Sequence, residues 1–157
     1  MNKKLIDSIG QKLIKKKRSV AIAESVTSGH IQAALSLAKD ASKFFQGGIT
    51  VYNPGQKTRH LDIEPIHALE CNSVSAQVAK QMAENTCRLF LSDYALAITG
   101  FASTVPEDGI NELMAYISIA RNNKVIVTRK IIPNKSNPHS VQLFYTEAAL
   151  KLLDKFI

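Results

Sequence analysis

Ser25 stands in a setting that suits a nucleophile. In the segment 23–30 (AESVTSGH), an apolar strand runs into the serine and a helix is expected to begin shortly after it. This geometry projects a hydroxyl beside helix N-terminal amides, which attract phosphate, carboxylate or a tetrahedral oxyanion. Thr27 or Ser28 can cap the helix, and Gly29 permits close approach of the backbone. Ordinary helix capping is the alternative interpretation of the same residues.

A second segment supplies a possible base for this serine. Residues 52–57 (YNPGQK) place Tyr52 at the end of a strand and Lys57 on the first turn of the next helix. A lysine acts as the base of a serine only when burial or a neighbouring cation lowers its pKa. Taken alone, Tyr52 fits an ordinary strand residue and Lys57 an ordinary surface lysine. The hypothesis therefore requires the fold to bring Lys57 to Ser25.

A third polar segment follows residues 94–99 (YALAIT), which read as a short apolar strand. Ligands collect at the carboxyl ends of strands in open α/β sheets, so the loops at 25–29, 52–57 and 99–103 are expected to share one crevice. The spacing assigns no His–Asp partner to Ser25, and a conventional catalytic triad is therefore not indicated.

The histidines and cysteines give no indication of a metal site. Cys71 and Cys87 are too few for a disulfide framework or a four-cysteine zinc site, and they are expected as buried thiols in a reducing cytoplasm. The acidic residues do not cluster, and neither HExxH nor a similar spacing occurs. No metal and no cofactor is expected. The histidines considered are His30, His60, His67 and His139.

Helices and strands alternate along the chain, and they must position these segments. The pattern favours an α/β fold, a three-layer α/β/α sandwich around a mixed, mostly parallel sheet, with a C-terminal hairpin as its antiparallel part. Residues 1–157 are expected to form a single domain. Strands are expected at 19–24, 44–53, 94–99, 113–120 and 125–132, and helices within 1–18, at 27–38, from 54, at 75–91 and from 137.

Several local details are expected within these elements. Gly47-Gly48 marks a bulge or a close approach in its strand, and Asn122-Asn123-Lys124 is expected as a three-residue hairpin turn. The apolar faces of the helices are expected to point inward. Their residues are Leu5, Ile6, Ile9 and Leu13 in the first helix, Val78, Met82 and Leu89 in helix 75–91, and Val141, Phe144, Tyr145, Ala148 and Leu152 in the last.

The composition is that of a soluble globular protein, with 45% hydrophobic and 21% charged residues in 157. No apolar run approaches the roughly 18 residues that a membrane span needs, and the charged N-terminus does not resemble a signal peptide. A cytoplasmic protein with no membrane partner is therefore expected.

The formal net charge of +7 lies almost entirely at the N-terminus. Residues 1–18 hold seven Lys or Arg against one acid, Asp7. The run 15–18 is expected in the last turn of the first helix, where cations complement the helix dipole. A phosphate-binding patch is the alternative, but no aromatic interleaving or recognised motif supports it, so a nucleic-acid partner is not expected.

Four motifs together resemble one known family. They are A-E-S-x-T-x-G at 23–29, F-x-G-G-x-x-x-Y-x-x-x-x-K at 45–57, V-S at 74–75 and T-G-x-A at 99–102. In this order they resemble the CinA C-terminal domain, or nicotinamide-nucleotide amidohydrolase, family over nearly the whole chain. The resemblance implies an α/β/α sandwich and a metal-independent hydrolase that converts nicotinamide mononucleotide and water to nicotinate mononucleotide and ammonia.

The resemblance also implies roles for individual residues. Ser25 is the nucleophile, and Lys57, with Tyr52 beside it, takes the serine proton and later delivers one to the departing ammonia. The amides around Thr27, Ser28 and Gly29 stabilise the oxyanion. The segment that contacts the substrate comprises Thr99, Gly100, Ala102 and Ser103.

The chain departs from the family pattern where a phosphate would be held. Val26 and Ser28 replace family residues in the first motif, and residues 100–107 (GFASTVPE) replace a glycine-rich loop. Asn134-Lys135-Ser136 and Gln142 stand where the family has a basic stretch. Lost arginines matter because bidentate contacts to phosphate are among the stronger hydrogen bonds.

These departures leave three functions open. The chain is an active amidohydrolase on a small nucleotide or another amide, a catalytically impaired nucleotide-binding or regulatory paralogue, or a nucleic-acid accessory protein. The sequence also leaves open whether the chain forms a homo-oligomer.

Overall fold

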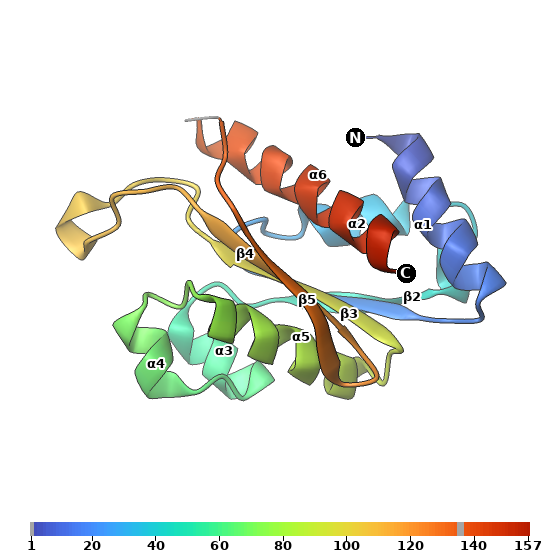
Figure 1. The fold of residues 1–157 in the computed structure, drawn as a ribbon, viewed down its shortest axis with the longest axis horizontal. Helices are drawn as coiled ribbons and strands as arrows, with labels where there is room; N and C mark the ends of the chain where they lie inside the picture. Colours follow the sequence, from blue (N-terminus) through green and yellow to red (C-terminus); the bar gives the residue numbers. More distant parts are fainter. Residues whose placement is uncertain (1, 135–136) are drawn as a thin grey trace.

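Five strands form one mixed sheet in the order β2-β1-β3-β4-β5 (Figure 1). The computed structural model describes residues 2–134 and 137–157, so Lys135 and Ser136 of the altered basic stretch lie outside the described residues. β2, β1 and β3 run parallel to one another, and β4 runs antiparallel to its two neighbours, β3 and β5. The strands are β1 (Val20–Glu24), β2 (Phe45–Thr50), β3 (Tyr94–Gly100), β4 (Ala115–Arg121) and β5 (Lys124–Ile131).

Helices cover both faces of this sheet, as Figure 1 shows. One face carries α1 (Lys3–Lys15), α2 (His30–Ser36) and α6 (Pro138–Phe156). The other carries α3 (Pro54–Leu61), α4 (Pro65–Glu70) and α5 (Ala76–Phe90). Two short 3-10 helices, η1 (Ala41–Lys43) and η2 (Pro106–Asp108), lie in loops. The expected three-layer sandwich around a mixed sheet is confirmed.

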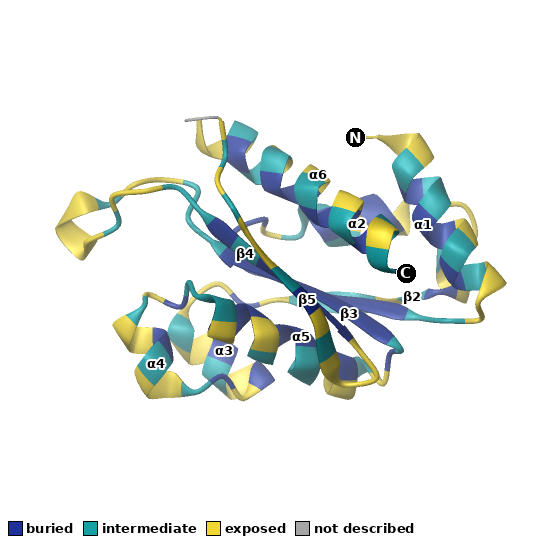
Figure 2. Cartoon of the chain, viewed as in Figure 1, coloured by how far each residue is buried: buried dark blue, intermediate teal, exposed yellow. Residues whose placement is uncertain are grey.

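Each face of the sheet has its own apolar core, and the strands between them are buried (Figure 2). Successive strand residues alternate between the cores, so Ile22 and Leu96 pack toward α1, α2 and α6. Ala23, Ala95 and Ala97 pack toward α5, where their small side chains let the helix lie close to the sheet. Strands buried on both faces explain the continuous apolar runs in the sequence.

Gly47 and Gly48 shape β2 as the sequence predicts. Gly47 has φ of +104°, next to a register shift between β1 and β2. A Cβ on Gly48 would lie 2.5 Å from the Ile22 carbonyl oxygen, so only glycine fits there. The glycine pair therefore lets β2 lie against β1, and Tyr52 follows two residues after the strand ends at Thr50.

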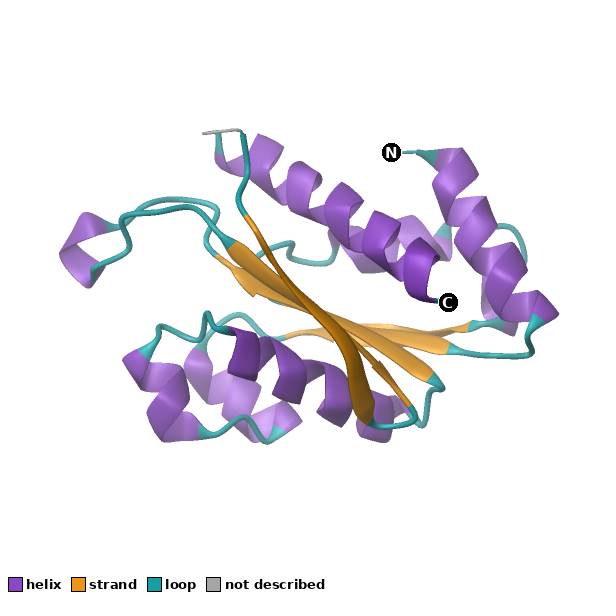
Figure 3. Cartoon of the chain, viewed as in Figure 1, coloured by secondary structure: helices purple, strands orange, loops and turns teal. Residues whose placement is uncertain are grey.

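Several expected element boundaries are wrong: β2 ends at Thr50 rather than at 53, and β4 begins at Ala115 rather than at 113. Figure 3 shows the tight turn that joins β4 and β5. This turn holds two residues, Asn122 and Asn123, both with positive φ, because such a turn matches the twist of paired strands. α2 begins only at His30, after a run of turns, and α4 was not expected from the sequence.

The inward faces of two helices also differ from the expectation. Leu89 is 53% exposed, because α5 buries the stripe through Val78, Met82 and Cys87 instead. In α6, Val141 and Tyr145 are buried as expected, whereas Phe144, Ala148 and Leu152 are only partly buried and flank the buried stripe. Its residues include Val141, Tyr145, Ala149 and Leu153.

The N-terminal basic run lies mostly outside α1. The helix ends at Lys15, and Arg18 instead forms an ion pair with Asp93 at 2.6 Å. Within α1, Ile6, Ile9 and Leu13 are buried, whereas Leu5 is only half-buried. Of the thiols, Cys87 is buried as expected and Cys71 only half-buried. No helix among the described residues has the length and apolarity to cross a membrane.

Candidate active site

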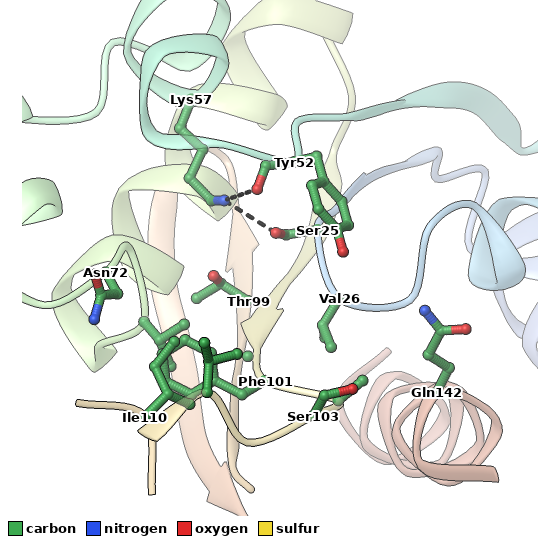
Figure 4. A pocket seen from close by; sticks show the side chains of 14 residues that line it. Ser25, Val26, Tyr52, Lys57, Asn72, Thr99, Phe101, Ser103, Ile110 and Gln142 are labelled. Carbon is green, nitrogen blue, oxygen red and sulfur yellow. Dashed lines mark hydrogen bonds between the residues drawn. The ribbon is translucent and has the colours of Figure 1, made fainter. Parts of the chain in front are cut away.

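The fold brings Lys57 to Ser25. Lys57 Nζ donates hydrogen bonds to Ser25 Oγ at 3.0 Å and to the Tyr52 carbonyl oxygen at 3.3 Å (Figure 4). Lys57 is 1% exposed and Ser25 5% exposed. The hypothesis that Lys57 acts as a base for Ser25 requires these side chains to meet, and they are in direct contact and both buried.

Burial changes the acid–base character of Lys57. Removal from water disfavours the ammonium and lowers the pKa of Lys57 from its ordinary value of 10.5 to about 8. The ion pairs formed by the described residues give this ammonium no carboxylate partner that would oppose the effect. A useful fraction of Lys57 is then the neutral amine near pH 7, as a base for a serine requires.

Local signals in the sequence place Lys57 on α3. Asn53 Oδ1 accepts from the Gln56 amide at 2.9 Å, and Pro54 follows at the first helical position. The helix therefore begins at a fixed residue, with Lys57 on its first turn. Lys57 and Leu61 form its buried side, so the lysine is turned inward rather than toward solvent.

Glu24 is a buried residue of the site that the sequence analysis missed. Its carboxylate is fully buried and accepts from the Thr27 hydroxyl at 2.5 Å. It also accepts from the amides of Gly29 and Ile31, each at 3.1 Å, and of Gln32 at 2.8 Å. An acid at the end of an apolar strand, directly before the serine, was the signal available.

Glu24 changes the expected role of the α2 N-terminus. The amides that were expected to hold an oxyanion around Gly29 already donate to Glu24, and the Ser28 amide donates to the Ser25 carbonyl. Thr27, Ser28 and Gly29 do not line the cavity at the site. Within the described chain, the amide N–H groups of Val26 and Thr27 donate to no protein acceptor, and Val26 does line the cavity.

A cavity of about 230 Å³ opens beside Ser25. The end of β3, with Thr99 and Gly100, and the loop after it, with Ala102 and Ser103, form one wall, as the shared crevice predicts. The Thr99 hydroxyl donates to the Ser73 carbonyl oxygen at 2.7 Å. Lining residues not singled out as contacts from the sequence are Val26, Asn72, Val74, Phe101, Val105, Ile110 and Gln142.

Tyr52 enters the site differently from Ser25 and Lys57. Its carbonyl oxygen accepts from Lys57, whereas its side chain is 71% exposed and lines the cavity. The phenol hydroxyl forms no hydrogen bond with the described residues, and in Figure 4 it points away from the lysine. Among the described residues, Tyr52 therefore forms a hydrogen bond with the Ser25–Lys57 pair only through its main chain.

Comparison with known proteins identifies relatives along the whole chain. The model of the CinA C-terminal domain matches residues 2–157. A CinA-like protein of Prochlorococcus marinus is 30% identical over 156 residues, covering 97% of this chain and 36% of the relative. A CinA-like protein of Endomicrobium trichonymphae is 32% identical over 104 residues, covering 66% of this chain and 24% of the relative. The chain thus spans well under half the length of these curated relatives.

Solved structures share the fold. A CinA superfamily protein from Klebsiella pneumoniae superposes with a TM-score of 0.90 at 22% identity, over 99% of this chain and 97% of that one. A CinA superfamily protein from Escherichia coli gives a TM-score of 0.87 at 25% identity, over 98% and 90% of the two chains.

Proposed function

The chain belongs to the CinA C-terminal domain family, and from this premise we propose that it is a metal-independent amidohydrolase with Ser25 as its nucleophile. The contact of 3.0 Å between Lys57 Nζ and Ser25 Oγ carries the proposal. A buried lysine with a pKa of about 8 is a competent base for this hydroxyl. The proposed substrate is the carboxamide of nicotinamide mononucleotide, which yields nicotinate mononucleotide and ammonia.

The first half of the proposed reaction forms an acyl-enzyme. Neutral Lys57 takes the Ser25 proton as Oγ bonds to the amide carbon, and the carbonyl oxygen becomes an oxyanion. The free N–H group of Val26, which lines the cavity, is the proposed oxyanion donor, because the Gly29 amide already donates to Glu24. The Lys57 ammonium then protonates the departing nitrogen, the C–N bond breaks and ammonia leaves.

The second half returns the enzyme to its starting state. Water attacks the acyl carbon while Lys57 accepts its proton, and the ester bond to Ser25 Oγ breaks. Lys57 returns that proton to Oγ, and the carboxylic acid leaves. The Tyr52 carbonyl holds Nζ beside Oγ throughout, and the segment from Thr99 to Ser103, at the end of β3, is proposed to contact the rest of the substrate.

Ammonia release by the purified protein tests this function. The substrates are nicotinamide mononucleotide, nicotinamide and simple aliphatic amides. We expect Ser25→Ala to abolish release and Lys57→Ala to lower kcat by about 100-fold or more. Lys80→Ala, at an exposed site on α5, is the matched control and keeps the wild-type rate.

Two outcomes would contradict the proposal in different ways. Equal rates for wild type and Lys57→Ala would remove the lysine from the mechanism. Thermal stabilisation of the wild type by nicotinamide mononucleotide without any ammonia would instead identify a nucleotide-binding paralogue that has lost turnover.

A further inference from the structure

The side chain of Tyr52 has no task in the mechanism above. Its main-chain carbonyl positions Lys57, but its phenol hydroxyl forms no hydrogen bond to the described residues. The ring nevertheless lines the cavity beside Ser25 and is 71% exposed (Figure 4). What Tyr52 presents to a ligand is therefore its aromatic surface, next to the nucleophile, rather than an acid or base.

Such a ring is suited to bind a flat group. A tyrosine side chain can bury a large area with few rotatable bonds to fix, which is why it is frequent at binding sites. The rest of the lining adds apolar surface from Val26, Phe101 and Ile110. An amide carried directly on an aromatic ring would bring that ring into the cavity as its carbonyl reaches Ser25.

We propose that the Tyr52 ring stacks on the aromatic ring of the substrate, and that this contact selects aromatic carboxamides over aliphatic ones. The inference rests on the proposed function and assigns it a substrate class. An electron-poor ring, above all a cationic pyridinium, gains most because the face of a tyrosine ring is negative. A cation held there also disfavours the ammonium form of Lys57 and so favours the base.

Two substitutions separate the ring from the hydroxyl. Tyr52→Leu removes the aromatic face, and we expect it to raise the KM for nicotinamide mononucleotide by about tenfold with little change in kcat. Tyr52→Phe keeps the face and is expected to rescue that KM. For propionamide, which has no ring to stack, Tyr52→Leu is expected to leave KM unchanged.

The opposite pattern would overturn the inference. If Tyr52→Phe lowers kcat by tenfold or more, the hydroxyl takes part in proton transfer. If Tyr52→Leu leaves the KM for nicotinamide mononucleotide unchanged, the ring does not bind substrate. Because the side chain is exposed, both variants are expected to fold, and their thermal unfolding provides the check.

Calorimetric binding separates this inference from the proposed reaction. Nicotinamide mononucleotide is titrated into Ser25→Ala, alone and combined with each Tyr52 variant. A Kd about tenfold weaker with Leu but not with Phe supports the stacking role even if the wild type releases no ammonia. Equal Kd values for all three, or no binding to Ser25→Ala, would overturn the stacking role.

Discussion

At the scale of single residues, the chemistry of the site follows from the neighbours of Lys57. Its ammonium is buried against a hydroxyl and a carbonyl, both neutral. Neutral acceptors hold the group in place without the Coulombic attraction that would raise its pKa. By contrast, the guanidinium of Arg18 lies near the surface and pairs with Asp93. The same type of charge is thus paired with an acid at one position and buried against neutral groups at the other.

The pKa of Lys57 predicts how the rate depends on pH. With a pKa of about 8, about a tenth of the lysine is neutral at pH 7, and about a hundredth at pH 6. We therefore expect kcat/KM for ammonia release to fall about tenfold from pH 7 to pH 6 and to level off above pH 9. A rate that stays constant from pH 6 to pH 9 would show that Lys57 is not the base.

Glu24 predicts a positioning effect on Ser25. Glu24→Gln turns an NH₂ group toward donors that now meet a carboxylate, so part of the buried network is lost. We expect the variant to lose about 2–4 kcal/mol of unfolding free energy in urea. Because the turn after Ser25 loosens, kcat is expected to fall more than KM rises.

The matched control for this substitution is Glu70→Gln, at an exposed position on α4. It is expected to keep both the stability and the rate of the wild type. If Glu24→Gln is as stable and as active as this control, the carboxylate does not hold the turn in place.

At the scale of elements, local signals decided what could be predicted. The Asn53-Pro54 start of α3 and the Gly47-Gly48 irregularity depend on neighbouring residues alone, and the structure has both. α4, at Pro65–Glu70, is short, and its one buried residue leaves little periodicity to detect. Leu89 was misplaced because the face of α5 that is buried depends on how the helix lies on the sheet.

The residues of the candidate site also fall into those that the sequence predicts and those that it does not. Ser25, Lys57 and the residues after β3 occur in short motifs at strand ends, so their convergence could be expected from the fold class. Gln142 comes from α6, far along the chain, and only its place in the basic stretch of the family pattern indicated it. The hydrogen bonds that Glu24 accepts from α2 depend on side-chain geometry, which the spacing of residues in the sequence does not indicate.

The C-terminal end of α5 predicts a stabilising substitution. Leu91 follows the helix with φ of +49°, a left-handed backbone conformation that is strained for leucine. Its side chain is 90% exposed and therefore gains little from packing. We expect Leu91→Gly to raise the unfolding free energy by about 0.5–1 kcal/mol in urea. Leu89→Gly, inside the same helix, is the control and is expected to lower it by about 1 kcal/mol. A loss of stability in both would contradict the strain at Leu91.

At the scale of the whole molecule, the sheet topology determines where the site lies. β1 is flanked by β2 on one side and β3 on the other, and its two neighbours follow it in the chain. The helices α2 and α5, after β1 and before β3, lie on opposite faces of the sheet (Figure 1). A crevice opens at the carboxyl ends of strands where connections diverge in this way. Ser25 after β1 and Gly100 at the end of β3 are both found there.

A charge in this crevice lowers the stability of the whole fold. Lys57 is buried with a pKa of about 8, against 10.5 in its ordinary state. Between these values the unfolded chain binds more protons than the folded one, so stability rises as the pH rises from 8 to 10.5. Below pH 8 the cost of the buried charge is present in full.

Lys57→Met removes that charge at similar volume and loses the hydrogen bonds to Ser25 and Tyr52. We expect the variant to be inactive but more stable than the wild type at pH 7, by roughly 1–3 kcal/mol in urea. The difference is expected to shrink at pH 10, because the wild type no longer buries a full charge. A wild type that is equally stable at pH 7 would mean that burying this lysine costs the fold nothing. The gain in the variant would instead measure what the protein gives up in stability to keep a base beside Ser25.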